Sequence, residues 1–149
     1  MEAVILIGAQ GSGKSTFAKE RLFDSHLRIN LDMLRTHRRE TLLLEACLAA
    51  GQRFIIDKTN PTAQVRRRYI EAARAHGFRV VGYFFAAPLE ECLRRNRERP
   101  GKESIPAAAV VATYRRLERP QFSEGFDELY EVTTAGDGQF VVQAMTRES

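Results

Sequence analysis

The sequence predicts an α/β fold, in which a central parallel β-sheet is flanked by helices on both faces. Short, β-branched apolar runs alternate with helix-like segments along the chain, and this alternation is typical of parallel strands joined by right-handed crossover helices. The first apolar run also ends in a glycine-rich segment, Gly8 to Ser15, that precedes a predicted helix. Both observations favour a sandwich of helices around one sheet.

The strands are predicted from short runs of β-branched and aromatic residues. The first, at 4–7, is expected to be fully buried and to end at Gly8. Further strands are expected at 27–30, 53–57, 79–85 and 129–133, with a weaker one at 139–143.

Helices are expected between the strands, with glycine or proline at their boundaries. Gly51 and Gly77 are placed to close two of them, and Pro61 suits the first turn of another. The predicted helices cover 14–22, 32–50, 61–76, 88–97 and 106–118.

The composition is that of one globular domain. The chain has 149 residues, of which 44% are hydrophobic and 28% charged, and a domain of this size buries roughly two-thirds of its surface. We therefore expect a single domain over 1–149 with a short flexible tail at 144–149. The net charge of +4 and the pI near 9.4 favour anionic ligands, without choosing among a nucleotide, a sugar phosphate and a nucleic-acid end.

Cysteine usage and hydropathy indicate a reduced compartment. Cys47 and Cys92 form no CxxC motif, so both are expected to be buried apolar residues and the protein to be cytoplasmic. The apolar run at 3–7 is too short for a signal peptide, and no stretch of the sequence could span a bilayer. No membrane partner is expected.

The segment Gly8-Ala9-Gln10-Gly11-Ser12-Gly13-Lys14-Ser15 satisfies the phosphate-binding pattern G-x-x-x-x-G-K-[ST] between a strand and a helix. Its glycines let the backbone turn its N–H groups inward toward phosphates, and the following helix adds the positive end of its dipole. Lys14 is expected to reach the β- and γ-phosphates of ATP or another nucleoside triphosphate, and the Ser15 hydroxyl to bind Mg²⁺. The expected nucleotide-binding residues of this P-loop are Gly8, Gln10, Gly11, Ser12, Gly13, Lys14, Ser15 and Thr16.

Asp57 is a second candidate for the metal site. It ends the buried strand at 53–57, and a carboxylate at the carboxyl end of a strand beside a P-loop can hold Mg²⁺ directly or through water. The alternative is an aspartate that caps the turn before Pro61.

Asp32 and Arg35 are candidates for the acceptor side. They follow the short strand at 27–30, which places Asp32 at a strand tip or helix start, facing the γ-phosphate. A hydroxyl acceptor must lose a proton, so a carboxylate there can act as general base, whereas a phosphate acceptor needs arginines alone. The alternative is that Asp32 only caps the helix.

Two arginine clusters complete the candidate residues. Four arginines crowd the end of the helix at 88–97, just before Pro100-Gly101-Lys102, and a mobile cationic lid there could close over the triphosphate; the alternative is a solvated helix end. A second cluster at 66–68 follows Pro61, and because three consecutive arginines point in three directions on a helix, a solvated face is favoured over a contact with an acceptor strand. The first cluster is Arg94, Arg95, Arg97 and Arg99.

Together these segments resemble the 5′-hydroxyl polynucleotide kinase domain of the phage and mammalian end-healing enzymes. The resemblance covers roughly 1–132. It is carried by the P-loop, Asn30-Leu31-Asp32-Met33-Leu34-Arg35, Asp57-Lys58-Thr59-Asn60-Pro61, Arg94-Arg95-Asn96-Arg97-Glu98-Arg99 and the segment 119–126.

The resemblance implies a P-loop kinase with an arginine-bearing lid that moves the γ-phosphate of ATP to a 5′-OH end of DNA or RNA, in nucleic-acid repair. It implies that Asp32 is the general base and that Arg35 orients this base and the acceptor. It also implies that Arg95 and Arg99 lie on the lid over ATP, and that Thr59 and Asn60 lie near the acceptor nucleotide.

Other functions stay open at this point. Lys58 departs from the family pattern and leaves the Mg²⁺ geometry around Asp57 uncertain. Asp32-Met33-Leu34-Arg35 also resembles a segment of adenylate kinases, which keeps a small-molecule or nucleoside monophosphate kinase as the alternative. A non-catalytic ATP-binding switch protein is a further one. The oligomeric state is open, a homodimer included.

Overall fold

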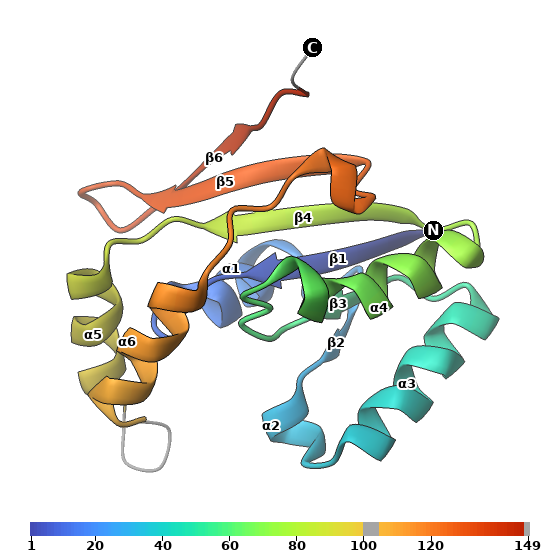
Figure 1. The fold of residues 1–149 in the computed structure, drawn as a ribbon, viewed down its shortest axis with the longest axis horizontal. Coiled ribbons are helices and arrows are strands. Elements are labelled where there is room, and N and C mark those ends of the chain that lie inside the picture. The colour runs from blue at the N-terminus through green and yellow to red at the C-terminus, as the bar shows by residue number, and fades with distance from the viewer. Residues whose placement is uncertain (100–104, 148–149) are drawn as a thin grey trace.

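A six-stranded sheet runs through the protein, with strand order β2-β3-β1-β4-β5-β6 (Figure 1). The computed structural model describes residues 1–99 and 105–147. Strands β1 to β5 are parallel to one another, and β6 is antiparallel to β5. The strands are β1 (Glu2–Ile7), β2 (Leu27–Ile29), β3 (Phe54–Ile56), β4 (Arg79–Phe85), β5 (Glu128–Thr134) and β6 (Phe140–Ala144).

The helices connect the parallel strands, as crossover connections require. They are α1 (Lys14–Arg21), α2 (Leu31–Leu34), α3 (His37–Ala50), α4 (Ala63–Ala75), α5 (Leu89–Arg97), α6 (Ala107–Arg116) and the 3₁₀ helix η2 (Phe122–Glu124). The expected α/β sandwich is confirmed. In the described residues no helix is both long and apolar enough to cross a membrane.

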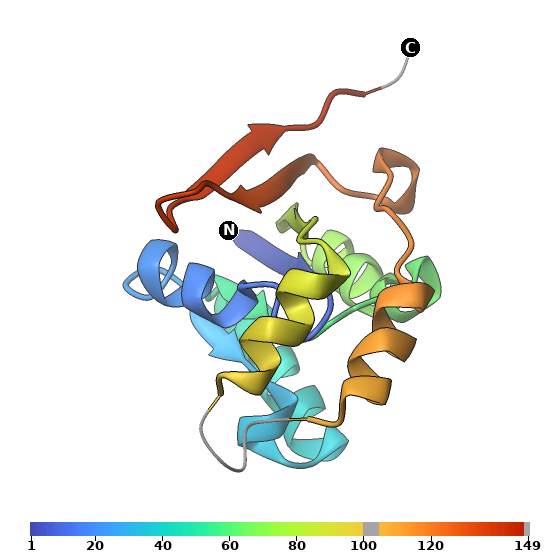
Figure 2. The same cartoon turned by 90° about the vertical axis from the view of Figure 1, so that its left-hand side faces the viewer.

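The central strand β1 is buried on both faces, because successive side chains of a strand point to opposite sides. Ala3, Ile5 and Ile7 join a cluster with α3 and α4. Val4 and Leu6 join a second cluster with α1 on the other face. α5 and α6 pack side by side at the carboxyl end of the sheet (Figure 2), where Cys92 and Val110 form a smaller cluster with Ala9.

The helix predicted at 32–50 is wrong as one continuous element. Arg35 has a φ of 75° and ends α2, and Thr36 starts α3 by accepting a hydrogen bond from the Arg39 N–H at 3.2 Å. A Thr N-cap is a helix start signal, so the break follows from local chemistry. Both cysteines are free and buried, as expected. The predicted tail at 144–149 begins inside β6 at Ala144, and residues 148–149 lie outside the described residues.

Arg66 corrects the expectation of a solvated arginine cluster. Its side chain is fully buried, and its guanidinium donates to the backbone oxygens of Asn60 and Pro61 at 3.0 Å and to that of Glu118. It also donates to both carboxylate oxygens of Glu124 at 2.9 Å. Arg66 therefore joins the start of α4 to the segment that follows α6.

The other two arginines of this cluster differ from Arg66. Arg67 is exposed and pairs with Glu71 one turn along α4 at 3.8 Å, as expected for a solvated face. Arg68 is half exposed and donates to the fully buried Glu40 at 2.6 Å. Only one of the three is thus a purely solvated side chain.

We predict that Arg66→Ala lowers the free energy of unfolding by about 3–5 kcal/mol, because it leaves Glu124 and three carbonyl oxygens without their buried cation. Urea unfolding followed by circular dichroism measures this loss. The matched control is Arg67→Ala on the same helix, which should change the value by less than about 0.5 kcal/mol. Equal effects of the two changes would contradict the structural role of Arg66.

Candidate active site

The P-loop lies between β1 and α1 and is fixed by its neighbours on both sides. The Gly8 N–H donates to the Thr59 oxygen at 3.0 Å, which ties the loop to the segment after β3. Gly11 has a φ of 80°, and a Cβ there would lie 2.3 Å from the backbone oxygen of Cys92 in α5. Glycine is required at this position because α5 packs directly against the loop.

Lys14 is a buried cation at the start of α1. Its side chain is 8% exposed, and Nζ donates to the Ala9 oxygen at 2.9 Å. Burial lowers the pKa of Lys14 to about 8, an effect that the nearby Asp57 carboxylate opposes. The lysine is thus held inside the loop, where a bound phosphate would raise its pKa and favour the charged form further.

Ser15 and Asp57 come together from α1 and from the end of β3. The Ser15 hydroxyl donates to Asp57 Oδ2 at 3.1 Å. Asp57 is 3% exposed, and a third residue, Arg28 of β2, donates from Nε to the same Oδ2 at 2.7 Å. Asp57 therefore faces the P-loop and its side chain does not cap the turn before Pro61.

The Ser15–Asp57 pair fits a Mg²⁺ ion. Mg²⁺ prefers oxygen ligands at roughly 2.0–2.1 Å in octahedral geometry, so two adjacent ligands stand about 2.9 Å apart. The 3.1 Å between the Ser15 hydroxyl and the Asp57 carboxylate oxygen is close to this spacing. When bound, the ion would be held by these two oxygens and would neutralise part of the charge of nucleotide phosphates.

A cleft of about 330 Å³ opens beside these residues, and Asp32 lines it. Asn30 is the N-cap of α2, since its Oδ1 accepts from the Met33 N–H at 3.0 Å. The helix-cap role considered for Asp32 is therefore filled by Asn30, and Asp32 is exposed at the cleft. The residues lining the cleft are Gln10, Lys14, Ser15, Asn30, Leu31, Asp32, Asp57, Lys58, Thr59, Arg99 and Ile105.

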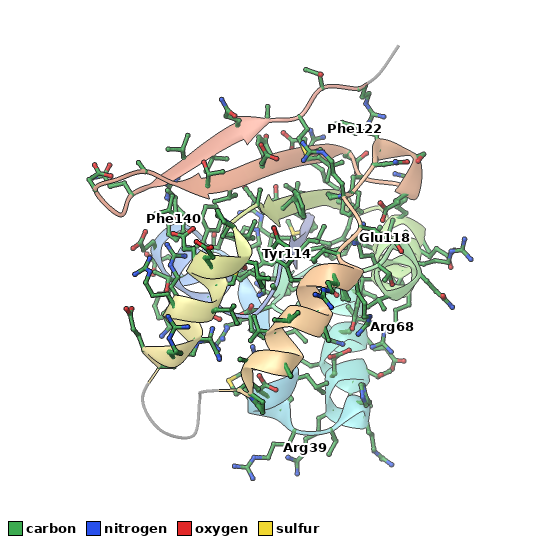
Figure 3. The ribbon with its side chains drawn as sticks, turned by 60° about the vertical axis from the view of Figure 1, so that its left-hand side comes forward. Arg39, Arg68, Tyr114, Glu118, Phe122 and Phe140 are labelled. Carbon is green, nitrogen blue, oxygen red and sulfur yellow. The ribbon has the colours of Figure 1, made fainter. Side chains whose placement is uncertain are left out.

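A second hollow of about 410 Å³ lies on the other side of the P-loop. Its wall includes Phe140 from β6, which packs against Phe17 of α1 with ring centroids 5.3 Å apart. Figure 3 shows Phe140 reaching from the β5–β6 hairpin toward α1 and α5. The residues lining this hollow are Gly11, Gly13, Thr16, Glu20, Arg95, Glu98, Arg99, Gly138 and Phe140.

The two predicted lid arginines lie at the end of α5 and beyond it. Arg95 donates to Thr134 at 3.0 Å and pairs with Glu91 at 3.0 Å, so it is held against the sheet edge. Arg99 lines both the cleft and the second hollow. The turn Pro100-Gly101-Lys102 lies outside the described residues, and a lid remains a proposal.

The predicted acceptor residues are distributed unevenly. Thr59 lines the cleft with Asp32. Arg35 is exposed at the end of α2 and is not part of the cleft wall. Asn60 is 1% exposed, has a φ of 44°, and donates to the Leu6 oxygen at 2.7 Å. The structure thus brings Thr59 to the site and uses the Asn60 side chain to hold β1.

Lys58, the residue that departs from the family pattern, has partners of its own. Its Nζ is directed to residues other than Asp57. It donates to the Tyr69 hydroxyl at 2.8 Å and pairs with Glu40 at 3.4 Å. Glu40 is fully buried on α3 and also accepts from the Tyr69 hydroxyl at 2.7 Å. This network compensates the Lys58 charge, so the ammonium does not displace a cation at the Ser15–Asp57 pair.

Sequence reasoning missed Glu40 and Arg28. Glu40 stands in the charged first turn of α3, which is typical of a solvated helix start, and Arg28 stands in a short edge strand. The partners of Arg28, at positions 15 and 57, lie on other elements. The only local signal is a charged residue within an otherwise apolar strand.

Comparison with known proteins places the chain in a family. Residues 32–120, more than half of the chain, match the model of the AAA_33 family, described as an AAA domain. The chain belongs to the AAA_33 family. The P-loop segment itself lies upstream of the matched residues.

Two curated relatives are similar over most of this AAA_33 chain. A bifunctional polynucleotide phosphatase/kinase of Schizosaccharomyces pombe is 28% identical over 137 residues, which is 88% of this chain and 33% of the relative. A protein of Acanthamoeba polyphaga mimivirus that carries the same name in provisional form is 30% identical over 139 residues, 89% of this chain and 33% of the relative. The chain thus spans about a third of the length of these relatives.

Solved structures share the fold at low identity. AvrRxo1-ORF1 in complex with ORF2 and ATP superposes with a TM-score of 0.70, 18% identity and coverage of 95% of this chain and 57% of that chain. A gluconokinase from Sinorhizobium meliloti 1021 gives a TM-score of 0.60 at 18% identity, covering 89% of this chain and 82% of that chain. The AAA_33 chain therefore has the fold of P-loop kinases.

We predict that nucleotide affinity falls as the pH rises above the Lys14 pKa of about 8. The phosphates bind the charged lysine, so above this pH each nucleotide must bring one proton, and affinity should drop by up to about tenfold per pH unit. Calorimetry with ADP between roughly pH 7 and pH 10 measures this slope.

The control for this prediction is Lys14→Arg, because arginine stays charged over the whole range. Its affinity is expected to be weaker but independent of pH. A flat profile for the unmodified protein would show that the Lys14 charge is not linked to nucleotide binding.

Proposed function

We propose that the protein is a Mg²⁺-dependent kinase that transfers the γ-phosphate of ATP to the 5′-hydroxyl end of DNA or RNA. The observation that carries this proposal is the cleft that the exposed Asp32 lines together with Lys14, Ser15 and the buried Asp57. A donor site and a free carboxylate in one cleft are the two parts that phosphoryl transfer to a hydroxyl needs.

The donor half uses the P-loop. Its amides and Lys14 hold the phosphates of ATP or another nucleoside triphosphate, while Ser15 and Asp57 hold Mg²⁺, which supplies charge neutralisation when bound. Lys14 becomes fully charged as phosphate approaches, because the negative charge offsets the cost of its burial. The P-loop thus positions the γ-phosphate at the mouth of the cleft.

The acceptor half uses Asp32. The carboxylate takes the proton of the 5′-hydroxyl while the hydroxyl oxygen forms a bond to the γ-phosphorus and the bond to the leaving oxygen of ADP breaks. Arg35 is assigned to the acceptor's phosphate, together with Thr59 in the cleft wall. The role of Asn60 in this proposal is limited to holding the backbone beside Thr59.

Arg95 and Arg99 are assigned to the charge that develops during transfer. Arg99 lines both the cleft and the second hollow, so it stands between the acceptor side and the nucleotide side. A cation in this place stabilises the equatorial oxygens of the transferring group. Arg95 is held close to Gly13, where its guanidinium would lie 2.9 Å from a Cβ at that glycine.

A nucleic-acid end is the preferred acceptor for two reasons. The names of both curated relatives include polynucleotide kinase, and the chain carries a net charge of +4, which favours an anionic partner. A small-molecule or nucleoside monophosphate acceptor and a non-catalytic ATP switch are the outcomes that the tests below separate from it.

We predict that Asp32→Asn slows phosphoryl transfer roughly 100- to 10,000-fold, because the amide cannot accept the hydroxyl proton. The affinity for ATP should stay within about twofold, since the lost interaction belongs to the transition state. Transfer of label from γ-labelled ATP and calorimetry measure the two quantities. The control is Asp24→Asn, an exposed carboxylate outside the cleft, and a full rate for Asp32→Asn would remove Asp32 as the base.

The acceptor is predicted to be a 5′-hydroxyl end. Label transfer is compared among a 5′-OH oligonucleotide, the same oligonucleotide already 5′-phosphorylated, and a panel of nucleosides and nucleoside monophosphates. Label on the 5′-OH oligonucleotide alone is the expected result. Label on a monophosphate would make the protein a small-molecule kinase with Arg35 as a phosphate clamp, and binding of ATP without any transfer would favour the switch protein.

A further inference from the structure

Arg28 occupies a position between the two proposed metal ligands. It is the middle residue of β2, and its Nε donates to Asp57 Oδ2 at 2.7 Å while Nη2 donates to the Ser15 hydroxyl at 3.2 Å. The two oxygens are themselves 3.1 Å apart. One guanidinium therefore contacts the same pair of oxygens that fits Mg²⁺.

The contact is chemically strong because of the burial of Asp57. The Asp57 side chain is 2% exposed, and a buried carboxylate requires a positive partner or a hydrogen-bond donor to remain ionised. A guanidinium supplies both in a planar fork that matches two neighbouring oxygens. Arg28 thus balances the charge of the Asp57 carboxylate and holds the Ser15 hydroxyl beside it.

The same contact can be released at modest cost. The Arg28 side chain is 34% exposed, and within residues 1–99 and 105–147 β2 is an edge strand that pairs with β3 alone. A partly solvated arginine can withdraw into water along its flexible stem without leaving a cavity in the core. Lys14, by contrast, is buried beneath the P-loop and cannot leave in this way.

We propose that Arg28 competes with Mg²⁺ for Ser15 and Asp57, so that the metal binds tightly only together with the nucleotide. A divalent cation and a guanidinium repel each other, so each weakens the binding of the other at Asp57 Oδ2. Nucleotide phosphates add ligands and negative charge, which favour Mg²⁺ at this pair and give Arg28 an anionic alternative. The inference rests on the proposed function, because it concerns the same metal site.

Arg28 thereby sets the order in which nucleotide and metal bind. In the nucleotide-free protein Arg28 holds the site in its assembled form. Metal then arrives as the Mg²⁺ complex of the nucleotide, which is the form of ATP that a kinase uses. Arg28 is a positioning residue in this scheme, and its effect is measured as metal affinity.

The test compares Mn²⁺ binding to the nucleotide-free protein and to Arg28→Gln, using the electron paramagnetic resonance signal of free Mn²⁺. We expect Arg28→Gln to bind Mn²⁺ roughly tenfold tighter, since a hydrogen-bonded charge pair of this kind no longer has to be broken. With ADP present, the difference in Mn²⁺ affinity between the two proteins should shrink to about twofold. The ADP phosphates then supply metal ligands and negative charge that exceed the opposing effect of Arg28.

Two further variants control this result. Arg28→Lys keeps the charge but lacks the fork that reaches both oxygens, so its Mn²⁺ affinity should lie between those of the unmodified protein and Arg28→Gln. If Arg28→Gln is unstable, the Mn²⁺ affinity of Arg28→Lys tests the competition in its place. Arg79→Gln breaks a pair of similar geometry, Arg79 Nε to Glu128 at 2.8 Å, away from the cleft, and should leave Mn²⁺ binding unchanged.

Thermal unfolding gives an independent readout. Asp57 loses its positively charged partner in Arg28→Gln, so Mg²⁺ alone should raise the melting temperature of this variant more than that of the unmodified protein. Equal Mn²⁺ affinity in the unmodified protein and both Arg28 variants would overturn the competition while leaving the metal site intact. Absence of Mn²⁺ binding in every protein, even with ADP, would overturn the metal site and the inference together.

Discussion

The charge of a carboxylate buried at the end of β3 determines which groups surround it in the site. Asp57 is nearly inaccessible to water, so its charge must be balanced by groups that other elements bring to it. Ser15 comes from α1, Arg28 from β2, and Lys14 is close enough for its charge to respond to Asp57. The P-loop, the edge strand and the central sheet are therefore held in one electrostatic arrangement.

The segment after Asp57 transmits this constraint through the backbone. The Thr59 oxygen accepts a hydrogen bond from a backbone N–H of the P-loop, and the Asn60 side chain donates to a backbone oxygen of β1. The Arg66 guanidinium donates to the backbone oxygens of Asn60 and Pro61. Each contact satisfies a buried polar group that would otherwise cost free energy. These contacts hold the segment that carries Thr59 into the cleft wall, and Asp32 lines the same cleft as an exposed carboxylate.

Local patterns predicted the P-loop and most strands, because short apolar runs and glycines determine them within a few residues. The break between α2 and α3 was equally local, since Asn30 and Thr36 are helix caps that the periodicity of 32–50 concealed. The burial of Arg66 could not be predicted in this way. Its partners Glu118 and Glu124 are far along the chain, and only the packing of α4 against the segment after α6 brings them together.

The same limit applies to the charges of the site. Asp57 was predicted from its place at a strand end, but its partner Arg28 belongs to another strand and became visible only through the strand order. From the sequence, Lys58 was expected to perturb the geometry of the metal site beside Asp57. In the structure, Glu40 of α3 and Tyr69 of α4 bind its ammonium group. Long-range charge pairing is thus the part of the site that the linear pattern does not contain.

The position of Phe140 has a consequence for how the protein is made. β6 carries Phe140 onto Phe17 and beside Gly13, although it is synthesised after the P-loop and after the other described strands. The wall of the second hollow therefore stays incomplete during synthesis until β6 pairs with β5. A ligand bound in this hollow would stabilise the fold only after that pairing, so it would favour chains in which β6 is already in place.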